Sequence, residues 1–120
     1  MNKYKNGFTL IEVLTGLVLL AFGLLAIAGM QITSVKGNFF SGNMTQASIL
    51  AQDRLETLRN VAYGGAALTV GTHDDGAMGI FTRRYTVSVV PGTTMLNIMV
   101  AVSWRDSSDH TISFTTVRFQ

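Results

Sequence analysis

The sequence contains no cysteine among its 120 residues, so no disulfide bond can hold its fold together. Many small exported domains depend on disulfide bonds because their hydrophobic cores are limited. We therefore expect this chain to gain its stability from the packing of a sheet on a helix and from contacts with neighbouring molecules.

Recognisable catalytic motifs are also missing. The sequence has no Gly-x-Ser-x-Gly elbow, no glycine-rich phosphate loop and no cysteine nucleophile. His73-Asp74-Asp75 and the segment with Asp106, Asp109 and His110 contain metal-ligand residue types, but neither has a zinc-site spacing and both lie in predicted turns. We expect no enzyme activity, no cofactor and no metal site. Calcium at Asp106 and Asp109 stays an open alternative, because carboxylates in turns can supply oxygen ligands.

Basic residues are few and scattered. Arg83 and Arg84 form the only adjacent basic pair in the sequence. In a strand they would point to opposite faces, which favours a solvated edge over a clustered basic surface. We therefore expect no binding to nucleic acid.

A long apolar segment dominates the N-terminal quarter of the chain. Val13–Met30 carries no charge, and with residues 8–11 it is long enough as a helix to cross the roughly 30 Å hydrocarbon core of a membrane. Lys3 and Lys5 precede it, so the positive-inside rule places the N-terminus in the cytoplasm. An ordinary secretory signal is the alternative, but its apolar region is usually only about 7–15 residues long.

One carboxylate, Glu12, stands at the front of this apolar segment. A carboxylate inside a bilayer costs on the order of 2.5–3.5 kcal/mol on insertion scales, so we expect Glu12 to have a partner. A side chain that reaches the headgroup region of a simple membrane anchor is the alternative.

The segment Gly7-Phe8-Thr9-Leu10-Ile11-Glu12, with a short basic leader before it and an apolar helix after it, resembles the class III signal of type IV prepilins and of the pseudopilins of type II secretion. The resemblance covers about a fifth of the chain. It implies cleavage after Gly7 by a prepilin peptidase and methylation of the new amino group of Phe8. It also implies that Glu12 pairs with the amino terminus of a neighbouring subunit during assembly. Removal of residues 1–7 would leave seven basic and seven acidic residues, so the chain's excess of basic residues belongs to the leader.

Shorter matches indicate which kind of subunit this is. The helix that contains residues 50–56 and the strand around residues 100–106 resemble minor pilins of the type IV pilus modification group, and they are also similar to the I-type minor pseudopilin. The small size and the missing cysteines favour a minor subunit near a filament tip over a bulk subunit of the shaft. Two further functions stay open, namely a module at the pilus tip that binds DNA or surfaces and an anchored protein that never assembles.

The glycines of the predicted N-terminal helix fall into two groups, one in its apolar part and one in the more polar part that follows. Gly16, Gly23 and Gly29 lie in the apolar part, where small residues let neighbouring helices approach closely. Residues 31–45 are more polar and include Gly37 and Gly42, so we expect this stretch to bend or loosen.

From Met44 onward the helix is predicted to be amphipathic. Its apolar residues form a stripe along one side of the helix, and we expect a sheet to cover this stripe. Gly64-Gly65 are expected to end the helix at about residue 63. The stripe consists of Met44, Ala47, Ala51, Leu55, Leu58 and Ala62.

Alternating residues predict an antiparallel sheet after the helix. Phe81–Val90 places Tyr85, Val87 and Val89 on one face, and residues 95–104 alternate even more regularly, ending at Trp104. Residues 110–119 supply a further strand, with a bulge near Thr115-Thr116 to bring Val117 and Phe119 onto the face of Ile112 and Phe114. Residues 64–80 are expected to be a connecting loop, with a possible short strand at residues 67–70.

The predicted fold is α+β and type IV pilin-like, with a long N-terminal helix packed on a small antiparallel meander of three or four strands. We expect a cleaved leader at 1–7, a transmembrane and assembly helix at 8–35 and a periplasmic head at 36–120, with the sheet at 81–120. The expected location is the inner membrane, with a single pass, and afterwards a pilus or pseudopilus. The implied partners are other pilin or pseudopilin subunits, the prepilin peptidase and the inner-membrane assembly platform.

Overall fold

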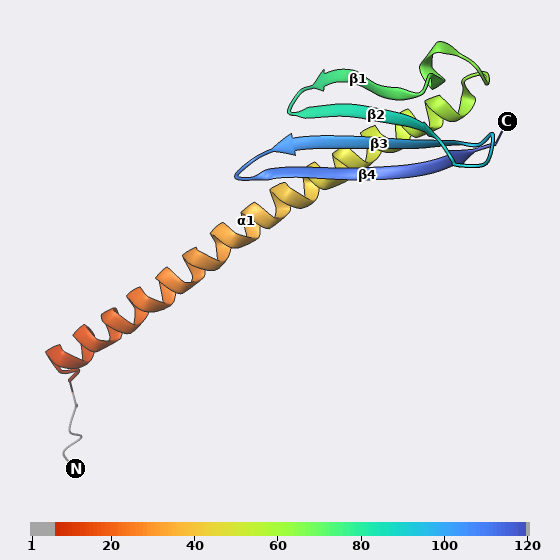
Figure 1. Ribbon diagram of the computed structural model, residues 1–120. Coiled ribbons are helices and arrows are strands. Elements are labelled where there is room, and N and C mark those ends of the chain that lie inside the picture. The colour runs from red at the N-terminus through yellow and green to blue at the C-terminus, as the bar shows by residue number, and fades with distance from the viewer. Residues whose placement is uncertain (1–6, 120) are drawn as a thin grey trace. The chain divides into compact units, whose positions relative to one another are not determined.

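The computed structural model describes residues 7–119 (Figure 1). These residues form one long α-helix, one short 3-10 helix and four strands. The elements in chain order are α1 (Leu10–Asn60), η1 (Ala66–Leu68), β1 (Gly71–Met78), β2 (Phe81–Val89), β3 (Leu96–Arg105) and β4 (Asp109–Arg118). The chain divides into two compact units, Met1–Phe40 and Ser41–Gln120.

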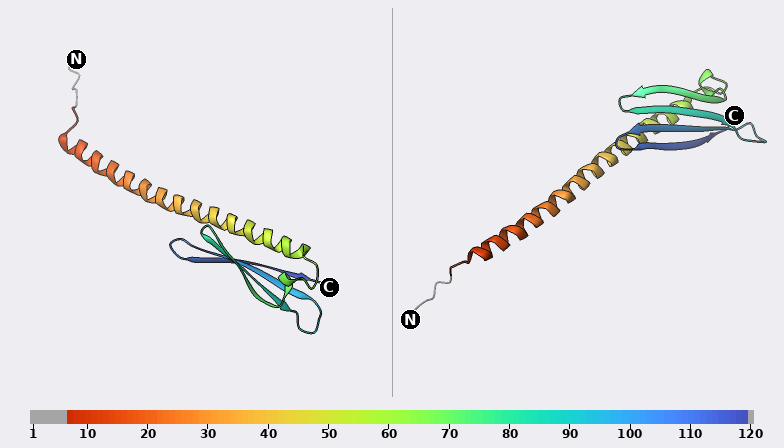
Figure 2. Two further views of the ribbon diagram at one scale, coloured as in Figure 1. Left: turned by 90° about the horizontal axis from the view of Figure 1, so that it is seen from above. Right: turned by 60° about the vertical axis from the view of Figure 1, so that its left-hand side comes forward.

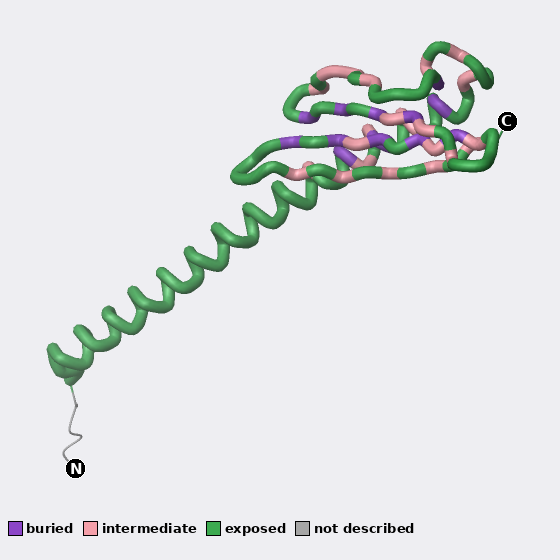
Figure 3. Tube along the Cα trace, in the orientation of Figure 1, coloured by how far each residue is buried: buried purple, intermediate pink, exposed green. Residues whose placement is uncertain are grey.

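The first unit contains the N-terminal part of α1. Each of its described residues is exposed, and Figure 3 shows this part of the helix in one colour. Among the described residues, α1 is the one helix long and apolar enough to cross a membrane. Large apolar side chains left in the open are unfavourable in water, so this surface requires lipid or protein around it.

Residues 31–45, where we predicted a bend or a loosening, are helical in the structure, and α1 continues through Gly37 and Gly42. An interior glycine lowers helix stability by about 1 kcal/mol relative to alanine, and two such losses do not interrupt a helix of 51 residues.

The second unit is an antiparallel sheet with the C-terminal part of α1 on one face (Figure 2). The strand order is β1-β2-β3-β4, so every strand pairs with its neighbour in sequence. The meander is the topology predicted from the turn residues between the alternating segments.

The core of this unit lies between the helix and the inner face of the sheet. Ala47, Ala51 and Leu58 of α1 are fully buried, and the two alanines let the helix backbone approach the strands closely. Strand β3 contributes alternate residues, all five of which are buried as predicted: Leu96, Ile98, Val100, Val102 and Trp104.

The predicted helical stripe was correct at its centre and wrong at its ends. Leu55 is half-buried, whereas Met44 is 44% exposed. Ala62 lies beyond the helix, because α1 ends at Asn60 and not near residue 63. The chain then turns, and Gly64 adopts a φ of 82°, which a glycine accepts without strain.

The connecting loop that we predicted at residues 64–80 is wrong at residues 71–78. Residues 71–78 form β1, and the possible strand at residues 67–70 is replaced by η1 and a bend. Strand β1 shows no apolar alternation, and its register shifts between Asp74 and Gly76. It is held by backbone pairing and by ionic contacts described below, neither of which appears in a hydrophobic pattern.

The bulge predicted in the last strand is also absent. Strand β4 pairs with β3 in one continuous register from Arg118 to Asp109. The parity therefore stays constant, and Val117 and Phe119 remain on the outer face, 48% and 72% exposed. Strand β2 likewise leaves Val89 50% exposed at its end, although Tyr85 and Val87 are buried as predicted.

Candidate processing and assembly site

The peptide bond between Gly7 and Phe8 lies in a short non-helical segment just before α1. Gly7 is exposed, and a Cβ atom built on it would meet no other atom within 4 Å. Phe8 is 84% exposed. The predicted cleavage bond is therefore exposed and lies outside the helix in this chain. The rest of the predicted leader, residues 1–6 with Lys3 and Lys5, lies outside the described residues.

Thr9 forms the N-terminal cap of α1. The backbone N–H of Glu12 donates to Oγ1 of Thr9 at 3.3 Å, and the carbonyl oxygen of Thr9 accepts from the N–H of Val13 at 3.2 Å. A threonine at this position with a glutamate three residues later is the sequence signature of a capping box. Sequence reasoning passed over Thr9, although the Thr-x-x-Glu spacing was a signal that could have identified it.

Glu12 is exposed in the first turn of α1, where the positive end of the helix dipole favours a carboxylate. Gly16 follows it by four residues and Gly23 by eleven, so at 3.6 residues per turn the three lie on one side of the helix. Gly29 lies on a different side. A Cβ atom built on Gly16, Gly23 or Gly29 would meet no other atom within 4 Å. Packing within this chain therefore does not require a glycine at these positions.

Residues 2–28 match the family model of the prokaryotic N-terminal methylation motif. The chain therefore carries the N-terminal methylation motif of type IV pilins and pseudopilins. The match spans the predicted cleavage bond, the cap of α1, Glu12 and most of the apolar segment. No curated protein and no solved structure matches the chain.

The fold agrees with this motif. A long apolar N-terminal helix whose C-terminal part packs on a four-stranded antiparallel sheet is a pilin-like α+β architecture.

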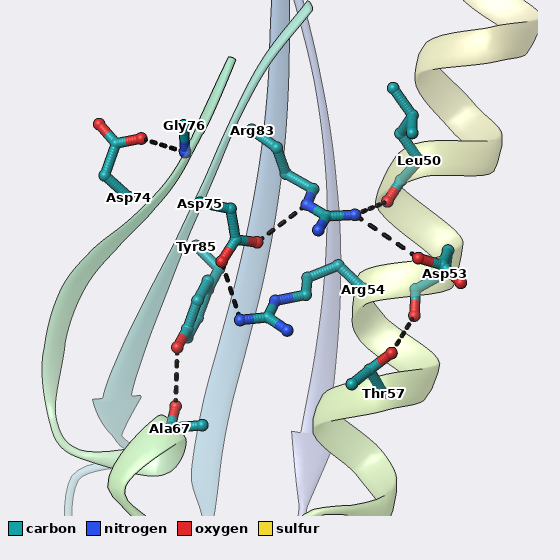
Figure 4. A network of polar contacts seen from close by, with 10 residues as sticks. All are labelled: Leu50, Asp53, Arg54, Thr57, Ala67, Asp74, Asp75, Gly76, Arg83 and Tyr85. Carbon is teal, nitrogen blue, oxygen red and sulfur yellow. Dashed lines mark hydrogen bonds and ion pairs between the residues drawn. The ribbon is translucent and has the colours of Figure 1, made fainter. Parts of the chain in front are cut away.

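The second unit, which we call the head, contains a buried ionic cluster that the sequence did not reveal (Figure 4). Asp75 of β1 accepts from Nε of Arg83 and from Nη2 of Arg54, both at 2.8 Å. Nη1 of Arg83 donates to the carbonyl oxygen of Leu50 at 3.1 Å and lies 3.6 Å from a carboxylate oxygen of Asp53. The side chains of Asp75 and Arg83 are only 12% and 10% exposed. The cluster thus joins α1 to β1 and β2.

This cluster overturns our interpretation of Arg83 and Arg84 as a solvated pair. The two side chains do point to opposite faces, but only Arg84 is exposed, where it pairs with Asp74 at 2.9 Å. Arg83 is a buried residue of the helix–sheet interface. Buried charges require close partners, and a sequence cannot show which carboxylate will supply them.

The acidic residues considered as metal ligands have protein partners. The Arg84 side chain, followed by the N–H of Gly76, lowers the pKa of Asp74. Asp106 accepts from the N–H of Ser108, and this bond, followed by the one from His110, lowers its pKa. Asp109 pairs with Arg105 at 2.7 Å. Among the described residues, no group of three or more His, Asp or Glu side chains could hold a metal ion.

We expect Asp75→Ala to destabilise the head by about 3 kcal/mol, because it removes the carboxylate that pairs with Arg54 and leaves the buried Arg83 with only its longer ionic contact to Asp53. The chain has one tryptophan, Trp104, which is 3% exposed, so its fluorescence reports unfolding of the head. The measurement is urea unfolding of the full chain in detergent micelles.

The matched control for this prediction is Asp109→Ala, which breaks the exposed pair with Arg105. Exposed pairs of this kind contribute less than about 1 kcal/mol. Equal midpoints for the two variants would show that the Asp75 cluster does not stabilise the head.

Proposed function

We propose that this chain is a minor structural subunit, a minor pilin, of a type IV pilus, and that it helps to initiate or modify filament assembly near the tip. The methylation motif at residues 2–28, with the exposed Gly7–Phe8 bond before the apolar helix, is the observation that supports the proposal most strongly. The minor I-type pseudopilin of a type II secretion system and a tip module that binds surfaces or DNA remain as competing functions.

Processing is the first step of the proposed function. Prepilin peptidase hydrolyses the bond after Gly7 and methylates the amino group that is freed on Phe8. This places a positive charge one residue before the Thr9 cap of α1. The amine is absent from the uncleaved chain, so processing would create the partner that Glu12 needs.

Assembly is the second step. We propose that Glu12 pairs with the amino terminus of a neighbouring subunit, because a buried carboxylate is tolerated when it is paired and then fixes register. Gly16 and Gly23, on the same side of α1 as Glu12, would let the neighbouring helix approach closely. Gly29 would serve a contact on another side of the helix.

Location follows from the same segment. Before assembly the apolar part of α1 would span the inner membrane once, with the basic N-terminus in the cytoplasm and the head in the periplasm. The inner-membrane assembly platform would then move the subunit into the filament. The exposed apolar surface of the first unit would pass from lipid to a core of packed helices.

Intact-mass measurement of the protein from its native membrane tests the proposal. The expected mass is that of a chain beginning at a methylated Phe8, and other subunits of the class should co-purify with it. A chain that still begins at Met1 in cells with an active peptidase would reduce the protein to a simple membrane anchor. Co-purified secretion subunits instead of pilus subunits would favour the pseudopilin function.

A further inference from the structure

Strand β4 forms one edge of the sheet and pairs with β3 alone among the described residues (Figure 1). It is 10 residues long, regular in register, and contains neither proline nor lysine. Natural proteins usually blunt an open edge with such residues or with a bulge, because unpaired backbone groups attract another strand. The opposite edge strand, β1, has a bulge at Asp74 and Gly76.

Apolar side chains remain partly uncovered on both faces of β4. On the helix side, Ile112 and Phe114 are only half-buried at the margin of the core. On the outer side, Val117 is 48% exposed and Phe119 72%. Figure 3 shows the resulting alternation along the strand. A strand added to this edge would cover apolar surface on both faces.

The sequence of β4 is nearly symmetric about Ser113. Ile112 and Phe114, both apolar, flank it, and Thr111 and Thr115 follow on either side. When two copies of such a strand pair antiparallel about Ser113, Ile112 faces Phe114 and Thr111 faces Thr115. The match covers these central residues, whereas His110 faces Thr116 and Asp109 faces Val117 at the ends. Cross-strand pairs of matched chemistry are the main source of stability in an antiparallel ladder.

The central residues decide between the possible registers. The register centred on Ser113 sets Ile112 against Phe114, so that two apolar residues face one another. A register centred on Phe114 would instead set Ile112 against Thr116, an apolar residue against a polar one.

We propose that β4 is a docking surface for a second copy of this chain. The two β4 strands pair antiparallel with Ser113 opposite Ser113, and the two sheets become continuous. This inference goes beyond the proposed function and does not depend on cleavage at Gly7, so either can fail without the other.

The natural absence of cysteine makes the pairing directly testable by disulfide formation. In the proposed register Ser113→Cys places two thiols on directly opposed residues, within the Cα separation of about 4.4–6.8 Å that a disulfide requires. Thr111→Cys is the matched control, because its own copy would lie about 13 Å away, four residues along the ladder. The full chain is oxidised in membranes and the dimer fraction is measured.

The Ser113→Cys chain is expected to give at least about tenfold more dimer than Thr111→Cys alone, since the control pair is outside disulfide range. Mixing Thr111→Cys with Thr115→Cys chains should restore the dimer, because these two residues face one another in the proposed register. Equal crosslinking of all single variants, no dimer from Ser113→Cys, or a disulfide only between Ser113→Cys and Thr115→Cys chains would each overturn the proposed pairing.

Discussion

The chain with Gly7 replaced by valine should keep residues 1–7 and accumulate with an unmethylated N-terminus. We expect maturation to slow by at least about tenfold, since even one surplus methylene in a tight enzyme pocket changes rates by about 10–200-fold. The structure separates this effect from misfolding. Nothing lies within 4 Å of a Cβ atom at Gly7, so the larger side chain disturbs no contact of the described chain.

Intact mass of the membrane-extracted protein, taken at successive times after induction, measures this block. The matched control is Gly37→Val, which places the same side chain at another exposed glycine without neighbours within 4 Å, outside the methylation motif. The control chain should mature at the normal rate. Full maturation of the Gly7→Val chain would mean that the bond after Gly7 is not the one the peptidase cleaves.

The parts of the fold that were predicted correctly are those in which hydrophobic burial determines the element. The apolar segment after Glu12 predicted the long helix, and the alternation from Leu96 to Trp104 predicted the buried face of β3. The first prediction rests on the length of an uninterrupted apolar run, and the second on an apolar period equal to that of a strand, so neither needed tertiary information.

The parts that were predicted wrongly are those that polar contacts determine. Strand β1 consists of residues typical of turns, and its place beside β2 is supported by the contacts of Asp75 with Arg54 and Arg83. In β4 we assumed that Val117 must reach the core, whereas Arg118 occupies that side and donates to the carbonyl oxygen of Leu58 at 3.0 Å. A long arginine can lay its apolar stem on the core and satisfy a helix carbonyl group with its head.

The candidate site was largely predictable because it is local. Gly7, Phe8 and Glu12 lie within a few residues of one another, and a contiguous motif preserves their spacing in any fold. The contribution of the structure is Thr9, whose hydroxyl caps the helix through the N–H of Glu12. This contact gives Glu12 a second possible role, because a glutamate at this place can also bond back to the cap and start the helix.

Glu12→Ala should leave cleavage and methylation intact but lower incorporation into filaments by at least about tenfold. Removing one partner of a buried ion pair costs about 3–5 kcal/mol, and a tenfold change in an equilibrium corresponds to about 1.4 kcal/mol. The measurement is the ratio of filament-associated to membrane-associated protein, with intact mass confirming maturation. Glu56→Ala, which removes an exposed glutamate of α1 in the head, is the control and should incorporate normally.

Glu12→Gln distinguishes the two roles of Glu12. Glutamine serves in a capping box as glutamate does, but it carries no charge for a neighbour's amine. If Glu12 acts through charge pairing, the glutamine chain will fail to incorporate as the alanine chain does. If Glu12 acts only by starting the helix, the glutamine chain will behave normally, and Thr9→Ala, which removes the other half of the box, will reproduce the defect of Glu12→Ala. Normal incorporation of Glu12→Gln would therefore exclude charge pairing and leave the capping of α1 as the function of this carboxylate.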